Sequence, residues 1–425
     1  MIDPRRGIGA DPDLGGRLGR LLGPAQNSGA ALSEASSDET AARVVWARLG
    51  EPGDATAGAL IASLGAEVAL RLLREGHSAR RIADQAREAG ADLTDPVVAS
   101  GLARWQPRLS YRELLEDLDR GIAAGLRLLT PASAEWPAGL GDLGDHAPLV
   151  LWVRGDPARL TDPQIAIVGA RACTGYGAHV TAELADVAGA LGATVVSGGA
   201  YGIDAVAHRT ALAAARTTIA VLAGGADRAY PRAHTALLSR IGETGLVCSE
   251  MMPGAAPTRW RFLQRNRLIA ALAQATLVTE AGLRSGSLNT AGHAATLGRP
   301  IGAVPGPVTS AASAGCHRLI RDYGAALVTG EEDLRELLSL PRAGVDELAE
   351  EHASAAVDRP PALHRRIVDA LPLRGGRTTE SVAQHAGVGI AEARGALAEL
   401  ALLGHVARHE TPGTGETRWA LHRRQ

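Results

Sequence analysis

The chain has 425 residues, with 44 Lys and Arg against 46 Asp and Glu. This length exceeds one ordinary hydrophobic core and predicts about two to four domains. The balanced charge excludes a protein that coats nucleic acid through a globally basic surface, so any site for a polyanion must be a local patch. Cys173, Cys248 and Cys316 are far apart and form no C-x-x-C pair, which argues against a zinc site or a disulfide scaffold and fits a reducing cytoplasm.

The N-terminal part is expected to hold a tail and a small helical domain. Residues 1–38 are rich in Gly, Pro, Asp and Ser, and we predict a flexible tail there. Residues 39–125 carry apolar positions at helical spacing, which predicts an all-α, SAM-like domain. The chain has neither a basic start followed by an apolar core nor a run of about twenty apolar residues. We therefore expect a soluble, cytoplasmic protein with no membrane contact.

Residues 126–340 are predicted to form the main domain. After two short strands near residues 126–130 and 149–153, β-branched runs alternate with Ala-rich helical runs. Because such runs are typical of strands buried on both faces, the fold class is α/β, with an extended Rossmann-like doubly wound parallel sheet. Right-handed crossovers place the strand-to-helix turns along one edge, where ligands bind. The predicted strands are Ile165–Val168, Thr194–Val196, Thr218–Leu222, Leu246–Cys248, Ala275–Thr279 and Pro300–Val304.

The C-terminal part is predicted to be a separate small domain. Residues 341–361 form a charged linker that also contains Ala and Pro. Residues 362–425 hold three helical runs followed by two segments that pair as a hairpin, which predicts a winged helix. Its third helix carries Glu392 and Glu399 against Arg394, a poor match for the phosphate attraction of a DNA-reading helix. A role in protein contact or dimerisation is the better interpretation.

Three glycine-rich turns follow predicted strands at the ligand-binding edge. The first contains Gly169 and Arg171, the second Ser197 and Gly198, and the third a Ser-Gly-Ser run. Glycine permits close backbone approach, and the helix N-termini that follow offer N–H groups to an anion. Each turn alone also serves plain turn geometry, but together they suit a chain of phosphates better than one small cofactor. The residues of the third turn are Ser285, Gly286 and Ser287.

Dinucleotide binding and catalysis are weaker interpretations, so we expect no cofactor, no metal and no enzyme. Arg171 stands where the second glycine of a G-x-G-x-x-G motif would be, and the next strand brings no acid for a ribose. Asp204 and His208 are four residues apart, but no third metal ligand has a readable spacing. Glu280, at a strand end, is the best single catalytic candidate; it keeps open a nucleoside-phosphate hydrolase as an alternative, beside a nucleotide sensor.

The segment Thr258–Leu268 combines cations with aromatic rings. It reads T-R-W-R-F-L-Q-R-N-R-L and contains Phe262, the single phenylalanine of the chain. Arginines neutralise phosphates and flat rings stack on unpaired bases, which is how single-stranded nucleic acid is bound. An amphipathic helix with solvated arginines would look the same in isolation. The three turns favour the nucleic-acid interpretation, with Arg259, Arg261, Arg265, Asn266 and Arg267 beside the ring.

The order of these motifs resembles the DNA-processing protein A family (DprA, also called Smf). The similarity runs from about Pro137 to Val328 and includes I-V-G-A-R-A-C-T-G-Y-G, V-S-G-G-A-Y-G-I-D, A-Y-P-R-A-H, F-L-Q-R-N-R-L-I-A and T-E-A-G-L-R-S-G-S-L-N-T-A. Ala170 stands where the family often has serine, and Leu263 where it usually has proline.

The resemblance implies a non-catalytic core that binds single-stranded DNA, dimerises, and loads RecA recombinase onto incoming DNA during natural transformation. Carried over by motif, Arg171 would lie in the DNA pocket with Gly169, Ser197 and Gly198. Arg232 of Y-P-R-A-H takes the place of a basic residue, and Arg259 with Phe262 matches the basic-x-x-aromatic pair of the family.

Overall fold

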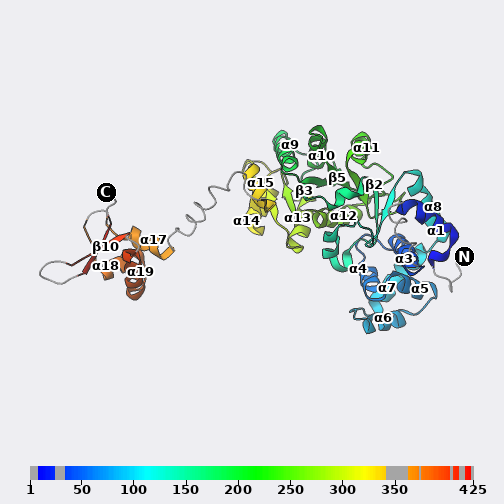
Figure 1. Ribbon diagram of the computed structural model, residues 1–425, viewed down its shortest axis with the longest axis horizontal. Helices are drawn as coiled ribbons and strands as arrows, with labels where there is room; N and C mark the ends of the chain where they lie inside the picture. The colour runs from blue at the N-terminus through cyan, green and yellow to red at the C-terminus, as the bar shows by residue number, and fades with distance from the viewer. Residues whose placement is uncertain are drawn as a thin grey trace. The chain divides into compact units, whose positions relative to one another are not determined.

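The computed structural model describes residues 8–23, 34–340, 362–372, 375–402, 405–410 and 417–422 (Figure 1). The chain divides into two compact units, Met1–Pro341 and Arg342–Gln425. The predicted linker 341–361 lies outside the described residues. Each unit has its own hydrophobic core, and the site lies in the first.

The first unit is built on a nine-stranded sheet with the order β1-β2-β6-β5-β4-β3-β7-β8-β9. The pairs β1–β2 and β2–β6 are antiparallel, and the other pairs are parallel. This confirms the predicted α/β class with a mostly parallel, Rossmann-like sheet. The strands are β1 (Arg127–Leu129), β2 (Leu151–Gly155), β3 (Gln164–Val168), β4 (Thr194–Ser197), β5 (Thr218–Val221), β6 (Leu246–Ser249), β7 (Ala275–Val278), β8 (Ile301–Ala303) and β9 (Ala326–Leu327).

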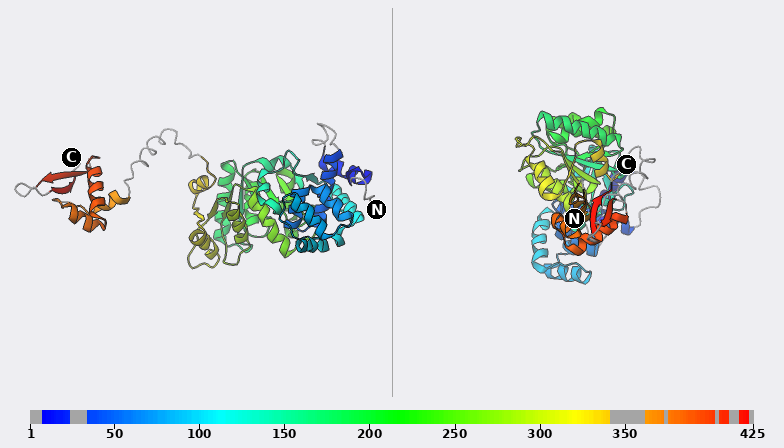
Figure 2. Two further views of the ribbon diagram at one scale, coloured as in Figure 1. Left: turned by 90° about the horizontal axis from the view of Figure 1, so that it is seen from below. Right: turned by 90° about the vertical axis from the view of Figure 1, so that its left-hand side faces the viewer.

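Helices cover both faces of the sheet, because its central strands are apolar on both sides. Ile165 and Ile167 of β3 pack toward one face, while Ala166 and Val168 pack toward the other. Figures 1 and 2 show α9, α10 and α11 together on one side and α12 and α13 on the opposite side. The helices are α9 (Gly175–Ala190), α10 (Ile203–Ala213), α11 (Thr235–Thr244), α12 (Arg259–Leu272), α13 (Ser287–Thr296), α14 (Ala314–Tyr323) and α15 (Glu331–Leu337), with 3₁₀ turns η3 (Ala138–His146), η4 (Pro157–Thr161) and η5 (Arg232–His234).

The N-terminal helical region packs on the same unit, near β1 and β2. Trp46 lies fully buried at its centre, against Trp105 at 4.9 Å between ring centroids. The region consists of η1 (Ile8–Ala10), α1 (Pro12–Leu22), α3 (Glu34–Leu49), α4 (Ala55–Leu64), α5 (Ala66–Arg74), α6 (Ala79–Glu88), α7 (Asp95–Trp105), η2 (Gln106–Arg108) and α8 (Tyr111–Ala123).

The prediction of a flexible tail over residues 1–38 is wrong for a large part of that range. Residues 12–22 form α1, capped by the Asp11 side chain, and Glu34 already begins α3. Four leucines of α1 share one helix face and are buried against the rest of the helical region, so few apolar residues are enough to fix the segment. Residues 1–7 and 24–33 lie outside the described residues. The buried leucines are Leu14, Leu18, Leu21 and Leu22.

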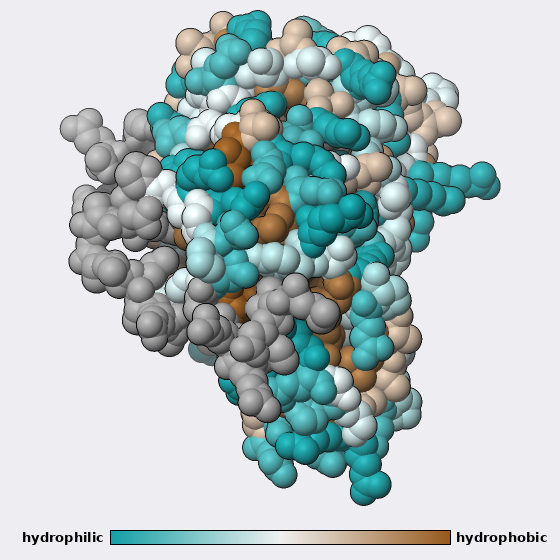
Figure 3. Space-filling view, turned by 90° about the vertical axis from the view of Figure 1, so that its right-hand side faces the viewer, coloured by the Kyte–Doolittle hydropathy of each residue, from teal (hydrophilic) through white to brown (hydrophobic). Residues whose placement is uncertain are grey.

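Where the coloured residues can be seen in Figure 3, the hydrophobic (brown) residues form small spots with hydrophilic (teal) and intermediate (white) residues around them. Among the described residues, no single helix has the length and apolar character needed to cross a membrane. One bent pair, Ala55–Leu64 with Ala66–Arg74, meets those two criteria when taken together, with 111° between its helices.

The described residues of the second unit form three helices followed by an antiparallel hairpin, the arrangement predicted for it. The helices are α17 (Ala362–Asp369), α18 (Thr379–Ala386) and α19 (Ile390–Leu402), and the hairpin pairs β10 (Val406–Glu410) with β11 (Thr417–Leu421). Ile367, Val382, Leu397 and Trp419 are buried in its core.

Candidate nucleic-acid interface

The three glycine-rich turns lie side by side at the carboxyl edge of the sheet. Strands β4, β3 and β7 are neighbours and parallel, so their ends meet at the same edge. The backbone N–H of Ala170 donates to the Glu280 carbonyl at 2.7 Å, and that of Ile203 donates to the Ala170 carbonyl at 3.1 Å. Segments that are distant in the sequence thus form one surface.

The first turn is held in place by Glu280. Its carboxylate accepts a hydrogen bond from the Thr174 N–H at 2.8 Å and another from the Thr174 hydroxyl at 2.6 Å. The side chain is 2% exposed, and a Cβ on Gly177 would lie 2.4 Å from one of its oxygens. Both oxygens of the Glu280 carboxylate are therefore engaged in fixing the start of α9.

The second turn is organised by Asp204, the second residue of α10. Its buried carboxylate accepts from the N–H groups of Gly198 at 3.1 Å and Ala200 at 3.3 Å. Burial raises the pKa of Asp204, while the charge of Arg265 and these hydrogen bonds act in the opposite direction. Ser197 is fully buried and donates to the Ile167 carbonyl at 2.7 Å. Ser197 therefore lies beneath the turn and lines neither hollow described below.

Asp204 and His208 do not form a metal site. The Nδ1 of His208 lies 2.7 Å from the Thr218 hydroxyl, and burial lowers the pKa of His208 to about 3. Within the described ranges, no group of three or more His, Cys, Asp or Glu side chains is arranged to hold a metal ion. The histidine packs as a neutral core residue.

The third turn presents hydroxyl and amide groups. The Ser285 and Ser287 hydroxyls are 2.7 Å apart. The Nδ2 of Asn266, on α12, donates to the Asn289 Oδ1 at 3.1 Å and reaches the Gly286 carbonyl at 3.4 Å. These contacts join α12 to the start of α13, so that both helices border the same hollow.

Two hollows lie along this edge, and Phe262 lines both. The first hollow has a volume of about 490 Å³ and lies between the first and third turns and α12. The second hollow, of about 550 Å³, lies beside Gly198 and the segment after β5. Of the predicted site residues, the first hollow is lined by Gly169, Arg171, Phe262, Arg265, Asn266, Ser285, Gly286 and Ser287, and the second by Gly198, Arg232 and Phe262.

Phe262 is half-buried and surrounded by cations and a second ring. The Arg171 guanidinium lies 4.8 Å from its ring centroid and that of Arg265 lies 5.8 Å away. The Tyr230 ring is 5.6 Å from it, between centroids, and is 48% exposed. The ring is thus part of a mixed arginine and aromatic surface.

Arg265 is the most buried cation of the site. Its Nη1 donates to the Val221 carbonyl at 2.6 Å. Burial lowers the pKa of Arg265 to about 10, although the nearby Asp204 opposes that effect, so the group stays charged at neutral pH. A Cβ on Gly198 would clash with this Nη1, so an alanine there would force the buried guanidinium to move.

Three other arginines of α12 lie outside both hollows. Arg267 is 2% exposed and pairs with Glu250 at 2.7 Å, and Arg261 pairs with Glu51 of the helical region at 2.9 Å. Arg259 is exposed at the start of the helix. The structure therefore separates Arg267 from the predicted cluster, because the Glu250 carboxylate binds it.

Sequence reasoning missed three cationic or aromatic residues that line the hollows. Arg284 precedes the third turn and is exposed in the first hollow, and Arg228 and Tyr230 are exposed in the second. Tyr230 directly precedes the Pro231-Arg232 pair, and a search for stacking rings beside arginines would have found it. Arg284 could have been found as the cation adjoining the Ser-Gly-Ser run.

The sequence of the core matches the family model described as DNA recombination-mediator protein A over residues 127–339. A Mycobacterium tuberculosis protein named as a DNA processing protein DprA is 43% identical over 377 residues, which cover 84% of this chain and 90% of that protein. The chain belongs to the DprA/Smf family of DNA processing proteins. Members of this family are recombination mediators.

Solved structures of the family resemble this chain as well. The X-ray structure of DprA from Streptococcus pneumoniae aligns with a TM-score of 0.55 and 30% identity, covering 69% of this chain and 95% of that one. A structure of DprA from Helicobacter pylori, described for its single-stranded DNA binding mode, aligns with a TM-score of 0.46 and 29% identity over 51% of this chain and 97% of that one.

Proposed function

We propose that this DprA/Smf protein binds single-stranded DNA along the two hollows and passes it to a recombinase. The observation that carries the proposal is the position of Phe262 in the wall shared by both hollows, with Arg171 over its ring. A base that is free of pairing can stack on such a surface, whereas the bases of a duplex are already stacked on one another. Phosphates on either side would meet the exposed guanidinium groups.

The distribution of charge supports a polymer over a mononucleotide. Arg171 and Arg284 border the first hollow, and Arg232 and Arg228 border the second. In the part of the chain that the structure describes, no carboxylate forms an ion pair with Arg171, Arg232 or Arg284. One small ligand would occupy one hollow, but a strand can engage the arginines of both. Sequence preference should be slight, because stacking and phosphate contacts tolerate every base.

The wider role that we propose follows the family. The protein would protect incoming single strands in the cytoplasm, act as a homodimer, and load RecA recombinase during natural transformation or recombination, without catalysing a reaction. The engagement of both Glu280 oxygens by Thr174 supports a binding role over hydrolysis.

Fluorescence anisotropy of a labelled oligo-dT at two salt concentrations tests the proposal. We expect saturable binding that weakens with salt and resists duplex competitor. A mononucleotide that binds much more tightly than the oligomer would instead indicate a nucleotide sensor, and turnover of a nucleoside monophosphate would indicate a hydrolase. Loading is a separate measurement, namely whether the protein accelerates assembly of RecA on the same strand.

A further inference from the structure

Helix α12 is shared between the two hollows and the N-terminal helical region. Phe262, Arg265 and Asn266 line the first hollow. Arg261 and Arg267 contact carboxylates outside it, and residues 261, 264 and 267 are spaced to share a different helix face. That second face meets the loop of residues 50–54, which joins α3 to α4.

Glu51 holds the first turn of α12 from this loop. Its Oε2 accepts from the Arg261 Nε at 2.9 Å, and its Oε1 accepts from the Arg261 Nη2 at 2.9 Å. Arg108 donates to the same Oε1 at 2.6 Å. The remaining guanidinium nitrogen of Arg261, Nη1, donates to the Ala256 carbonyl at 2.8 Å. The guanidinium is therefore fixed on three sides.

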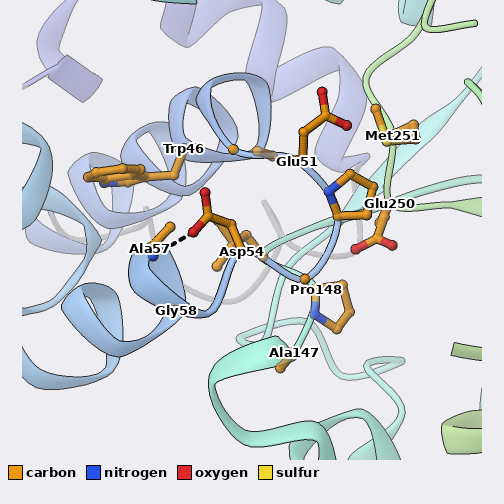
Figure 4. Close-up of a pocket in the computed structure, with 14 residues that line it drawn as sticks. Trp46, Glu51, Asp54, Ala57, Gly58, Ala147, Pro148, Glu250 and Met251 are labelled. Carbon is orange, nitrogen blue, oxygen red and sulfur yellow. Dashed lines mark hydrogen bonds between the residues drawn. The ribbon is translucent and has the colours of Figure 1, made fainter. Parts of the chain in front are cut away.

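A second set of contacts joins the loop of residues 50–54 to α12 near Gln264 and Arg267. Arg267 donates to the His146 carbonyl at 2.9 Å, and the His146 ring lies 2.9 Å from the Gly53 carbonyl. A Cβ on Gly53 would be 2.8 Å from the Gln264 amide oxygen. Figure 4 shows Glu51 and Glu250 among the residues that line the small cavity at this junction. The close fit leaves α12 little freedom to move.

Electrostatics explains why this helix needs an external carboxylate. The first turn of α12 contains Arg259 and Arg261 and no acidic residue, although a helix N-terminus favours negative charge. Burial tends to raise the pKa of Glu51, but its bonds with Arg261 and Arg108 outweigh burial and hold it below the ordinary value. Glu51 is therefore a carboxylate that supplies the missing negative charge from another part of the chain.

We infer that Glu51 is a positioning residue of the DNA site, through which the N-terminal helical region sets the affinity for single strands. The inference rests on the proposed function. Glu51 is not among the residues that line either hollow, but it fixes Arg261, which is one residue from Phe262. Removing the carboxylate loosens the start of α12 and the ring with it.

A double-mutant cycle in the full-length chain tests this role by anisotropy with labelled oligo-dT. Glu51→Ala and Arg261→Ala should each weaken binding by about three- to tenfold, and the double variant should be no weaker than the poorer single variant. The salt slope should remain that of the unsubstituted protein. Glu51→Gln, which keeps the shape but removes the charge, should weaken binding in the same direction.

A direct contact between Arg261 and DNA would change the affinity of Glu51→Ala in the opposite direction. If Arg261 contacts a phosphate and Glu51 merely competes for it, Glu51→Ala would tighten binding and steepen the salt slope by about 0.7. That result, or unchanged affinity in Glu51→Ala, overturns the inference. Failure of the unsubstituted protein to bind the strand would instead contradict the proposed function.

Glu67→Ala is the matched control. It removes a carboxylate from the same helical region, where Glu67 pairs with Arg71 of its own helix at 3.2 Å. Binding should not change in this variant. Thermal melting without DNA accompanies every measurement, and a loss of affinity in Glu51→Gln at an unchanged melting temperature supports positioning over general unfolding.

Discussion

The guanidinium of Arg171 lies over the ring of Phe262, 4.8 Å from its centroid. Arg171 comes from the turn after β3 and Phe262 from α12, so this contact joins two of the elements that border the first hollow. A cation on an aromatic face stabilises both groups. The pair therefore presents positive charge and a flat apolar edge at one point.

Arg171→Ala should weaken binding of every single-stranded sequence to a similar extent. The variant loses one charged contact worth about 1.5 to 3 kcal/mol, and the salt slope should fall by about 0.7. Anisotropy with oligo-dT, oligo-dA and a mixed sequence checks the uniformity. Arg80→Ala removes an exposed arginine from α6 and should leave affinity unchanged; a strong dependence on sequence in Arg171→Ala would count against a phosphate contact.

Phe262→Ala should cost about 1 to 3 kcal/mol of binding if the ring stacks one base. Tyr230 should behave similarly, with Tyr230→Ala weakening binding and Tyr230→Phe keeping it, because stacking needs the ring and not the hydroxyl. Chemical denaturation must be measured alongside. If Phe262→Ala lowers the free energy of unfolding as much as the loss of a core phenylalanine, the ring serves packing and the stacking role is wrong.

Salt dependence should reflect only the arginines that carboxylates leave available. Arg261 and Arg267 are excluded by their ion pairs, and so is Arg228, which pairs with Asp227 at 3.8 Å. Five guanidinium groups then remain to meet phosphates, which at about −0.7 each gives a slope of about −3.5 and about a hundredfold weakening between about 50 and 200 mM salt. Titrations over this range check it. A slope near zero contradicts the model. The five groups are those of Arg171, Arg232, Arg259, Arg265 and Arg284.

Gly198→Ala should abolish strand binding and lower stability. The added Cβ would lie 2.0 Å from the Arg265 Nη1, a buried group that cannot withdraw without losing its bond to Val221. Anisotropy and thermal melting are the measurements. Gly292→Ala, on α13 where a Cβ meets nothing within 4 Å, should be neutral. Equal behaviour of the two variants would show that the close approach is not needed.

Acid should destabilise the core through His208. Its folded pKa is about 3 and its ordinary value is 6.5, so below about pH 6.5 only the unfolded chain takes up the proton. The contribution of His208 to the free energy of unfolding is therefore complete above about pH 6.5. It is lost as the pH falls toward 3, by up to about 1.4 kcal/mol per pH unit. Denaturant titrations at several pH values should show a flatter acid limb for His208→Gln. The control His179→Gln, at an exposed position, should keep the slope.

The sheet could be predicted because each of its main strands has a recognisable local sequence pattern. Ile165–Val168 and its counterparts are short apolar runs with β-branched residues, and glycines mark the turns after β3, β4 and β7. That the three turns lie together followed from topology, since parallel strands end at one edge. The first helix was missed because its leucines gain stability only when α3 and α8 cover them.

The ion pairs could not be read from the sequence. Glu51 lies 210 residues before Arg261, and nothing near either residue indicates the other. Glu250 and Arg267 are closer in sequence, but their pairing depends on how α12 crosses the sheet. The sequence therefore overestimated how many arginines of α12 are free of a carboxylate partner. The mixture of arginines and aromatic rings was visible in the sequence itself.

The two faces of α12 impose a constraint on length. Each residue added to an α-helix rotates everything beyond it by roughly 100°. A single insertion at Gln264 would carry Arg265 and Asn266 away from the hollow and Arg267 away from Glu250 at once. Substitutions in this segment can be compensated one by one, but insertions and deletions cannot, so members of the family that bind DNA in this manner should share its residue count from Arg259 to Arg267.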